Sequence, residues 1–257
     1  MSADLSRGWL LGWQAGSLTP LPSNHLDDQL ATSTNNYFLS SIWMSGYGVA
    51  ADPSGNLHFV TGNSDYSGTS YNTMTNLSES VVKILPDLTT VVSFFTPSDQ
   101  RFGVPALDKK DSDFGSGGVL LLPDQTESSA ALALAAGRVG QMYLLNPSNL
   151  GGYSSNGKNQ VLGTFSIGGC WCGQSYFQGW DLNGRVVSSG GNKIIVWKVQ
   201  TSPTSNLAQE STSPQLNSGQ DAGFFTTVSS NGTQNPIIWA VGRPVDTESG
   251  ECDAIRF

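Results

Sequence analysis

The chain has 257 residues, enough for one large all-β domain or for two ordinary ones, and enough to bury a substantial core. Charged residues make up only 12% of it, whereas it holds 30 glycines. This composition is typical of many short strands joined by tight turns, not of charged amphipathic helices. The formal net charge of −8 argues against nucleic acid as a partner, because phosphate binding draws on clustered Lys and Arg.

Two patterns bear on export and membranes. The longest apolar stretches, such as residues 130–136, fall well short of the roughly 20 residues that a membrane helix needs. Residues 1–13 do not combine a basic segment with a sustained apolar one, so they lack the pattern of a signal peptide. The sequence therefore predicts no membrane span and no signal peptide within this chain.

A hairpin followed by a second strand pair is the first repeated unit. Residues 42–62 read IWMSGYGVAADPSGNLHFVTG, which predicts a small-residue strand, a turn at Asp52-Pro53-Ser54-Gly55, and a strand with Leu57, Phe59 and Thr61 on one face. Residues 80–85 and 90–95 then form a second predicted pair of strands.

The same scheme recurs further along the chain. Residues 113–142 join a run rich in Gly to one rich in Ala, and residues 141–145 are expected to pair with 160–165. Residues 170–189 form a third hairpin that turns at Asp181-Leu182-Asn183-Gly184.

Two further pairs complete the pattern. Residues 193–199 are expected to pair with a weak strand at 206–209, and residues 224–241 predict a fourth hairpin that turns at Asn231-Gly232.

Four-stranded units spaced about 50 to 70 residues apart favour a β-propeller over a sandwich, which gives no reason for the unit to recur. The prediction is an all-β fold, a partial propeller of about four blades of four-stranded antiparallel sheet, formed by the chain as one domain. Its blades are expected at residues 42–97, 113–166 and 169–209, with partial blades at 8–21 and 223–257. Small residues suit strands that crowd at a propeller axis, so the innermost strands are expected to begin near Met44, Gly117, Trp171 and Phe225.

Several phrases resemble a family of bacterial quinoprotein-like β-propellers built from pyrroloquinoline-quinone-like repeats. They are IWMSGYGVAADPSGNLHFVTGN, SVVKILPDLTTVVSFFTP, DFGSGGVLLLPD and GRVGQMYLLNPSNLGG. The resemblance extends from residue 8 to about residue 244, and it implies an exported protein, extracellular or periplasmic. It also implies a ring larger than this arc.

The resemblance raises the question of whether the chain binds a quinone. Quinoproteins hold the quinone in a central channel against a Trp face, with a calcium ion nearby. The repeat motif that ends each blade contains an Asp and closes with a Trp, and both are missing from its counterparts at residues 12–18 and 145–150. We therefore expect no cofactor, and keep a quinone with calcium as the alternative.

Cys170 and Cys172 form the most unusual local feature. Residues i and i+2 of a strand point to one face about 6.6 Å apart, near the upper limit for a disulfide. A strained disulfide is one interpretation of this thiol pair. Two small buried apolar residues on the core side of an inner strand, with Trp171 on the other face, is the interpretation that we favour.

Other candidate ligands do not form a recognisable site. Zinc would need further ligands at characteristic spacing, and only Cys252, His25 and His58 remain. His58 lies inside a strand pattern and is expected to be structural. The acidic group Asp108, Asp111 and Asp113 lacks the ligand pattern of a calcium loop, so we predict a solvated loop. No catalytic, cofactor-binding or metal-binding residue is assigned.

The sequence favours a non-enzymatic binding or scaffolding module of an exported bacterial protein over an enzyme. Its expected ligand is a protein or a carbohydrate contacted at the propeller face. The alternative is a quinoprotein-like oxidoreductase whose cofactor site is degenerate or lies outside this chain. The apolar faces of the terminal hairpins, which include Trp9, Trp13, Ile237 and Trp239, are expected to stay partly uncovered and to promote self-association.

Overall fold

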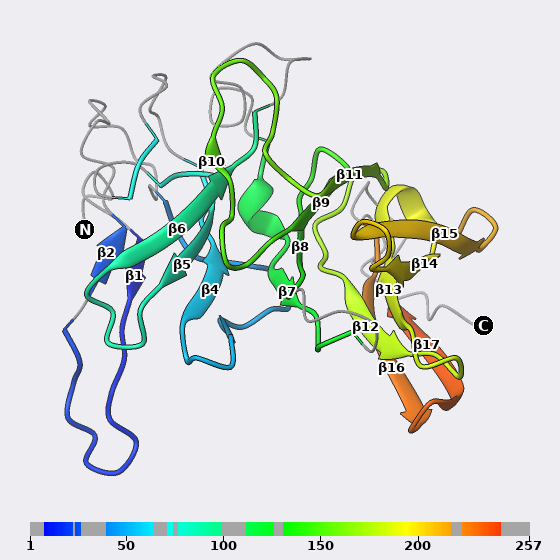
Figure 1. The fold of residues 1–257 in the computed structure, drawn as a ribbon, viewed down its shortest axis with the longest axis horizontal. Helices are drawn as coiled ribbons and strands as arrows, with labels where there is room; N and C mark the ends of the chain where they lie inside the picture. Colours follow the sequence, from blue (N-terminus) through cyan, green and yellow to red (C-terminus); the bar gives the residue numbers. More distant parts are fainter. Residues whose placement is uncertain are drawn as a thin grey trace, which may run out of the picture. The chain divides into compact units, whose positions relative to one another are not determined.

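The structure, a computed structural model, describes residues 8–22, 24–26, 40–63, 71–73, 77–98, 112–125, 131–216 and 223–242. Over these residues the fold is all-β, as the sequence predicts, with four-stranded antiparallel sheets (Figure 1). The chain divides into two compact units. The first holds residues 1–44, 48–115 and 147–161, and the second holds residues 45–47, 116–146 and 162–257.

The first unit contains a short hairpin and one larger sheet. The hairpin pairs β1 (Gly8–Leu10) with β2 (Asn24–Leu26). The larger sheet is an antiparallel meander, to which a fifth short strand adds in parallel at β6. In spatial order its strands are β10 (Gly152–Tyr153), β6 (Val91–Thr96), β5 (Val81–Ile84), β4 (Leu57–Val60) and β3 (Ala50–Ala51).

The turn between β3 and β4 forms where the sequence predicts it. One carboxylate oxygen of Asp52 accepts hydrogen bonds from the backbone N–H groups of Ser54 and Asn56, both at 2.9 Å. Gly55 supplies the left-handed residue of the turn, at φ +81°, and its N–H donates to the carbonyl of Asp52. Local side-chain chemistry therefore fixes this turn.

The second unit contains two complete four-stranded antiparallel sheets and one two-stranded hairpin. The first sheet has the order β11 (Gly163–Ser166), β9 (Gln141–Leu145), β8 (Ala133–Ala136) and β7 (Val119–Leu121). The second runs as a meander of β12 (Ser175–Gln178), β13 (Gly184–Ser188), β14 (Ile195–Gln200) and β15 (Asn206–Thr212). The hairpin pairs β16 (Phe225–Asn231) with β17 (Gln234–Val241).

The core of the second unit lies between its two complete sheets. Leu134 and Leu144 of the first sheet and Val186 and Trp197 of the second belong to one buried apolar cluster. The ring centroids of Phe165 and Trp197 lie 5.5 Å apart, so aromatic packing also joins the two sheets.

The predicted outer strand pairs are confirmed. β5 pairs with β6, β9 with β11, and β14 with β15, all antiparallel. β15 runs to Thr212 and is longer than the weak strand that the sequence predicted.

Of the four strands that were expected to be innermost, those expected near Met44 and Trp171 begin several residues later, and β7 begins close to Gly117. Met44 precedes a turn, because Met44 and Gly46 both adopt positive φ, and β3 begins only at Ala50. β7 begins at Val119 instead of Gly117, and β12 begins at Ser175 instead of Trp171. Only Phe225 marks the start of its strand.

The four segments that lead into the first strands nevertheless meet within the second unit. The N–H of Ser45 donates to the carbonyl of Ser116 at 3.0 Å, and the hydroxyl of Ser116 donates to the carbonyl of Cys170 at 3.4 Å. The fourth segment joins them at Gly223, where a Cβ atom would lie 3.0 Å from the sulfur of Cys172. Close contacts of backbone and side-chain atoms thus connect all four segments.

Tyr47 lies at the centre of this group of segments. A Cβ atom on Gly118 or on Gly173 would collide with the Tyr47 ring, so both positions require glycine for the ring to fit. A Cβ atom on Gly46 would lie 3.1 Å from the ring of Phe225. Burial raises the pKa of the Tyr47 phenol above its ordinary value.

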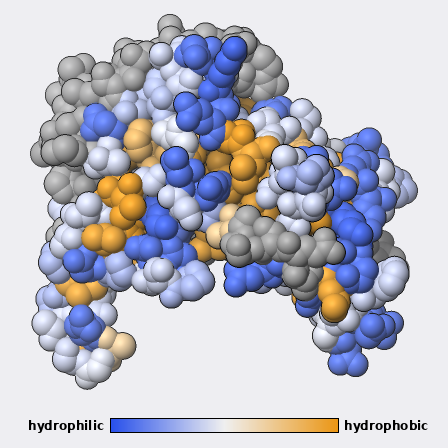
Figure 2. Space-filling model, viewed as in Figure 1, coloured by the Kyte–Doolittle hydropathy of each residue, from blue (hydrophilic) through white to orange (hydrophobic). Residues whose placement is uncertain are grey.

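The β16–β17 hairpin leaves one apolar face uncovered, as the sequence predicts. Cross-strand pairing places Phe225 opposite Val241, and Thr227 opposite Trp239, so these side chains share a face. Trp239 is 54% exposed and Ile237 52% exposed, and Figure 2 shows apolar surface at this hairpin, in orange at the lower right. Trp9 and Trp13 of the first unit are also exposed.

Candidate binding pocket

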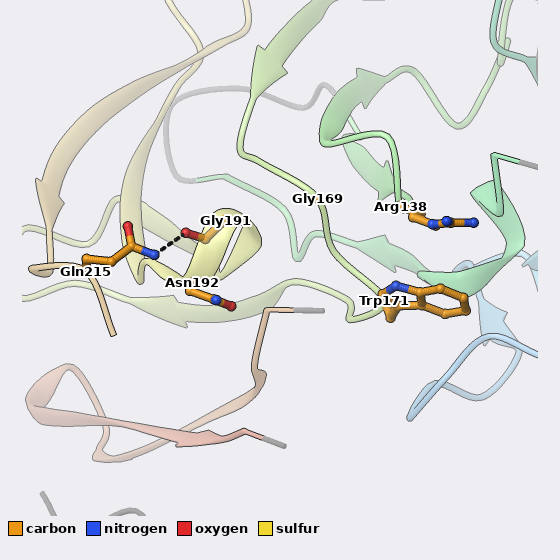
Figure 3. A pocket seen from close by; sticks show the side chains of 6 residues that line it. All are labelled: Arg138, Gly169, Trp171, Gly191, Asn192 and Gln215. Atoms are coloured by element: carbon orange, nitrogen blue, oxygen red, sulfur yellow. Dashed lines mark hydrogen bonds between the residues drawn. The ribbon is translucent and has the colours of Figure 1, made fainter. Parts of the chain in front are cut away.

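A pocket of about 400 Å³ opens on the second unit, within the range of small-molecule sites. Figure 3 shows Arg138 and Trp171 on one side of it and Asn192 and Gln215 on the other. Among the described residues, the lining consists of Arg138, Gly169, Trp171, Gly191, Asn192 and Gln215.

Close backbone contacts shape the pocket wall. A Cβ atom on Gly168 would lie 2.5 Å from the backbone nitrogen of Gly191, so only glycine permits this approach. The N–H of Gly191 donates to the carbonyl of Gly169 at 3.0 Å and ties the two strand connections together. Arg138 stands at the tip of the β8–β9 turn, which the bond from Gly140 N–H to the Gly137 carbonyl closes.

A disulfide bond joins the two residues on either side of Trp171, which forms the aromatic wall of the pocket. Cys170 and Cys172 are bonded to each other, and both are completely buried. From the sequence we favoured two unbonded cysteines in an inner strand. In the structure the two cysteines are bonded to each other, and they lie at a bend of the chain instead of in a strand. Their Cα atoms lie 5.2 Å apart, closer than the roughly 6.6 Å of an extended strand, because the chain bends at Trp171 before β12 begins.

The buried side of the disulfide contacts a well-anchored serine. The sulfur of Cys172 lies 3.0 Å from the hydroxyl oxygen of Ser189. That hydroxyl donates to the carbonyl of Phe224 and accepts from its N–H at 3.0 Å. The disulfide is therefore held against two further segments of the second unit.

Arg138 lies over the ring of Trp171. Its guanidinium carbon is 5.2 Å from the ring centroid, a cation–π distance. A guanidinium in this position keeps N–H groups at the edge of its plane, where they can donate to a planar anion such as a carboxylate. The pair therefore offers apolar surface and a positive charge side by side.

Two amides form the opposite side. Gln215 donates from its side-chain nitrogen to the Gly191 carbonyl at 3.0 Å, and the N–H of Leu216 donates to the Asn192 carbonyl at 2.9 Å. Among the described residues, the side-chain oxygen of Asn192 is buried and has no hydrogen-bond partner. A ligand hydroxyl or amide could donate to this oxygen.

The six lining residues supply hydrogen bonding, stacking and one positive charge. None of them carries a carboxyl, imidazole, thiol or hydroxyl side chain. These side chains can donate and accept hydrogen bonds, stack against a ligand and attract an anion.

His58 has a structural setting, as the sequence suggests. It is completely buried in β4, and its Nε2 atom lies 3.4 Å from Asp52, whose carboxylate also pairs with Lys83 at 3.0 Å. Burial lowers the pKa of His58, which favours the neutral form of the ring. Burial alone would raise the pKa of Asp52, but hydrogen bonds from Asn56, Lys83 and His58 outweigh it and hold that pKa well below its ordinary value.

A second ionic group lies on the β12–β15 sheet. The buried guanidinium of Arg185 binds Asp181 at 2.7 Å and Glu210 at 2.8 Å, and Lys198 also pairs with Asp181 at 2.7 Å. Hydrogen bonds from Arg185, and then from Lys198, hold the pKa of Asp181 well below its ordinary value. All of these charges are compensated within the sheet, so the group is structural.

Within the described part of the chain, no three His, Cys, Asp or Glu side chains gather closely enough to hold a metal ion. Asp108, Asp111 and Cys252, and the side chain of His25, lie outside that part. The described residues also include no helix that is long and apolar enough to cross a membrane.

Sequence reasoning identified the thiol pair but missed Arg138, Asn192 and Gln215. The only local signals were the glycine pairs at residues 168–169 and 190–191, which mark close backbone approach. No protein-family model matches this chain, and no curated protein matches its sequence.

Proposed function

We propose that this chain is a non-enzymatic β-propeller module that binds an acidic carbohydrate in the Arg138–Trp171 pocket. Two observations support the propeller arrangement. Three sheets repeat the same antiparallel four-strand order, and four segments leading into first strands contact one another around Tyr47. A propeller gathers its first strands in this way.

The single observation that carries the ligand class is the guanidinium of Arg138 held over Trp171 and opposite the Asn192 amide. Sugars present apolar C–H surface together with hydroxyl groups, which suit an indole and amide oxygens. Arg138 adds the donors that a carboxylate requires. A uronic acid combines all three features.

The disulfide supports an extracellular or periplasmic location, which the resemblance to exported propellers also implies. Disulfides persist in oxidising compartments and are rare in the cytosol.

We expect methyl β-D-glucuronide to bind more tightly than methyl β-D-glucoside, which carries a neutral hydroxymethyl group in place of the carboxylate. Losing a charge-assisted hydrogen bond costs about 1.5–3 kcal/mol, so Arg138→Gln should weaken glucuronide binding at least tenfold and leave glucoside binding unchanged. Trp171→Ala should abolish both. Saturation-transfer NMR titrations measure all of these affinities.

Trp180→Ala is the matched control, because Trp180 is 77% exposed and lies outside the pocket lining. This variant should bind both sugars like the unmodified chain. Equal affinities for the two sugars would contradict the role of the carboxylate. Failure of both sugars to bind would contradict the carbohydrate class.

We also expect the chain to self-associate through the apolar face of β16–β17. Exposed apolar patches and free strand edges favour pairing with another chain. Replacing Ile237 and Trp239 by Ser should shift the association to at least tenfold higher protein concentration in light scattering. Leu18→Ser, which removes an exposed leucine elsewhere, should not. A monomer at all concentrations would refute this expectation.

A further inference from the structure

We infer that the Cys170–Cys172 disulfide is the positioning element of the pocket, and that it holds Trp171 in place beside Arg138. The inference deepens the proposed function and rests on it for its ligand-binding consequence. Trp171 is the single residue between the two bonded cysteines. Its backbone is therefore closed into a small covalent ring.

The size of this ring decides what the bond can do. The stabilisation that a disulfide gives by constraining the unfolded chain grows with the number of residues it encloses. A bond across one intervening residue encloses almost the shortest loop available. The main effect of the bond is therefore local. It sets the direction in which the Trp171 side chain leaves the backbone.

The disulfide can fix that direction because its own position is fixed. Both cysteines are completely buried and belong to the apolar cluster of the second unit. Ser189 contacts the sulfur of Cys172, and the hydroxyl of Ser116 donates to the carbonyl of Cys170. With both neighbours held inward, the bend directs Trp171 toward the pocket, where it meets Arg138.

Without the bond, the segment can relax toward the extended conformation of the strand that follows it. Cα atoms two residues apart in a strand are about 6.6 Å apart, against 5.2 Å here. That change would rotate Trp171 away from its present place. Loss of the bond should therefore remove the pocket's aromatic wall while leaving the sheets intact.

The test compares the Cys170→Ala/Cys172→Ala variant with Cys252→Ala, which removes the remaining cysteine and keeps the bond. Hydroxyl-radical footprinting read by mass spectrometry reports the exposure of each tryptophan without any ligand. We expect oxidation of Trp171 to rise at least threefold in the double variant and to stay unchanged in the control. Trp197, which is buried in β14, should stay protected in both and so confirm an intact fold.

Binding of methyl β-D-glucuronide is the second measurement. Its Kd should rise at least tenfold in the double variant and stay unchanged in Cys252→Ala. If the unmodified chain does not bind the sugar, the proposed function is wrong, yet the oxidation of Trp171 still decides the positioning role. Unchanged oxidation of Trp171 in the double variant overturns the inference.

A third measurement is needed if the double variant fails to fold, which increased oxidation of Trp197 would reveal. The unmodified chain is then refolded with and without dithiothreitol. This dithiol transfers two electrons and two protons to the bond, leaving two thiols and the cyclic disulfide of the reagent. The reduced chain should show the same rise at Trp171 with Trp197 still protected, and no rise would refute the inference.

Discussion

Arg185→Ala should lower the free energy of unfolding by about 3 kcal/mol. The Arg185 side chain is almost completely buried and donates to Asp181 and Glu210 through two N–H groups each. Removing it leaves two carboxylates close together without their main partner. Urea denaturation followed by far-UV circular dichroism measures the loss.

Two comparisons separate this ionic effect from other causes. Lys193→Ala removes an exposed cation near the same sheet and should change the free energy of unfolding by no more than about 0.5 kcal/mol. Arg185→Lys keeps the charge but not the forked donors, so it should be intermediate. A loss as small for Arg185→Ala as for Lys193→Ala would contradict the prediction.

The pH dependence should identify the carboxylates as the source of the effect. Arg185 lowers the pKa values of Asp181 and Glu210 in the folded chain. A lowered folded-state pKa contributes stability above the unfolded value, about 4 for these groups, and the contribution is lost as the pH falls further. The difference between Arg185→Ala and the unmodified chain should therefore be largest near neutral pH and shrink below about pH 4.

The sequence predicts turns and strand pairs well where the determining interactions are local. The turn from Asp52 to Gly55 needs only a carboxylate that accepts from nearby N–H groups and a glycine that adopts positive φ. The hairpin turn next to Asn231-Gly232 is equally local.

Predictions failed where distant segments decide the backbone. Met44 and Trp171 lie in runs of residues that would suit a strand, but the chain bends at both places. Beside Met44, Ser45 bonds to the distant Ser116, and at Trp171 the neighbouring cysteines form a disulfide that the sequence pattern did not favour. The pocket is even harder to predict from the sequence. Arg138, Trp171, Asn192 and Gln215 lie in four separate connections, and each is an ordinary loop residue within its own local sequence. Only the packing of the sheets brings them together.

Gly173→Ala should be comparably damaging, because a methyl group at residue 173 has no space beside the ring of Tyr47. Adding one carbon to a tightly packed interior costs about 1–3 kcal/mol, and we expect the upper end because Gly118 confines the same ring. Thermal unfolding followed by circular dichroism measures the loss. Gly48→Ala is the matched control, since a Cβ atom there has open space around it, and it should change little.

A double-mutant cycle with Tyr47→Leu tests whether the ring itself is the cause. Leucine keeps part of the apolar volume but removes the ring atoms that a Cβ atom on Gly173 would meet. In the Tyr47→Leu background, Gly173→Ala should therefore cost about 1 kcal/mol or less, which gives a coupling energy of about 2 kcal/mol. Equal costs in the two backgrounds would show that Tyr47 does not fill the space between these segments. Tyr47 would then not be the residue around which these segments pack, and the support that its contacts give to the propeller arrangement would be lost.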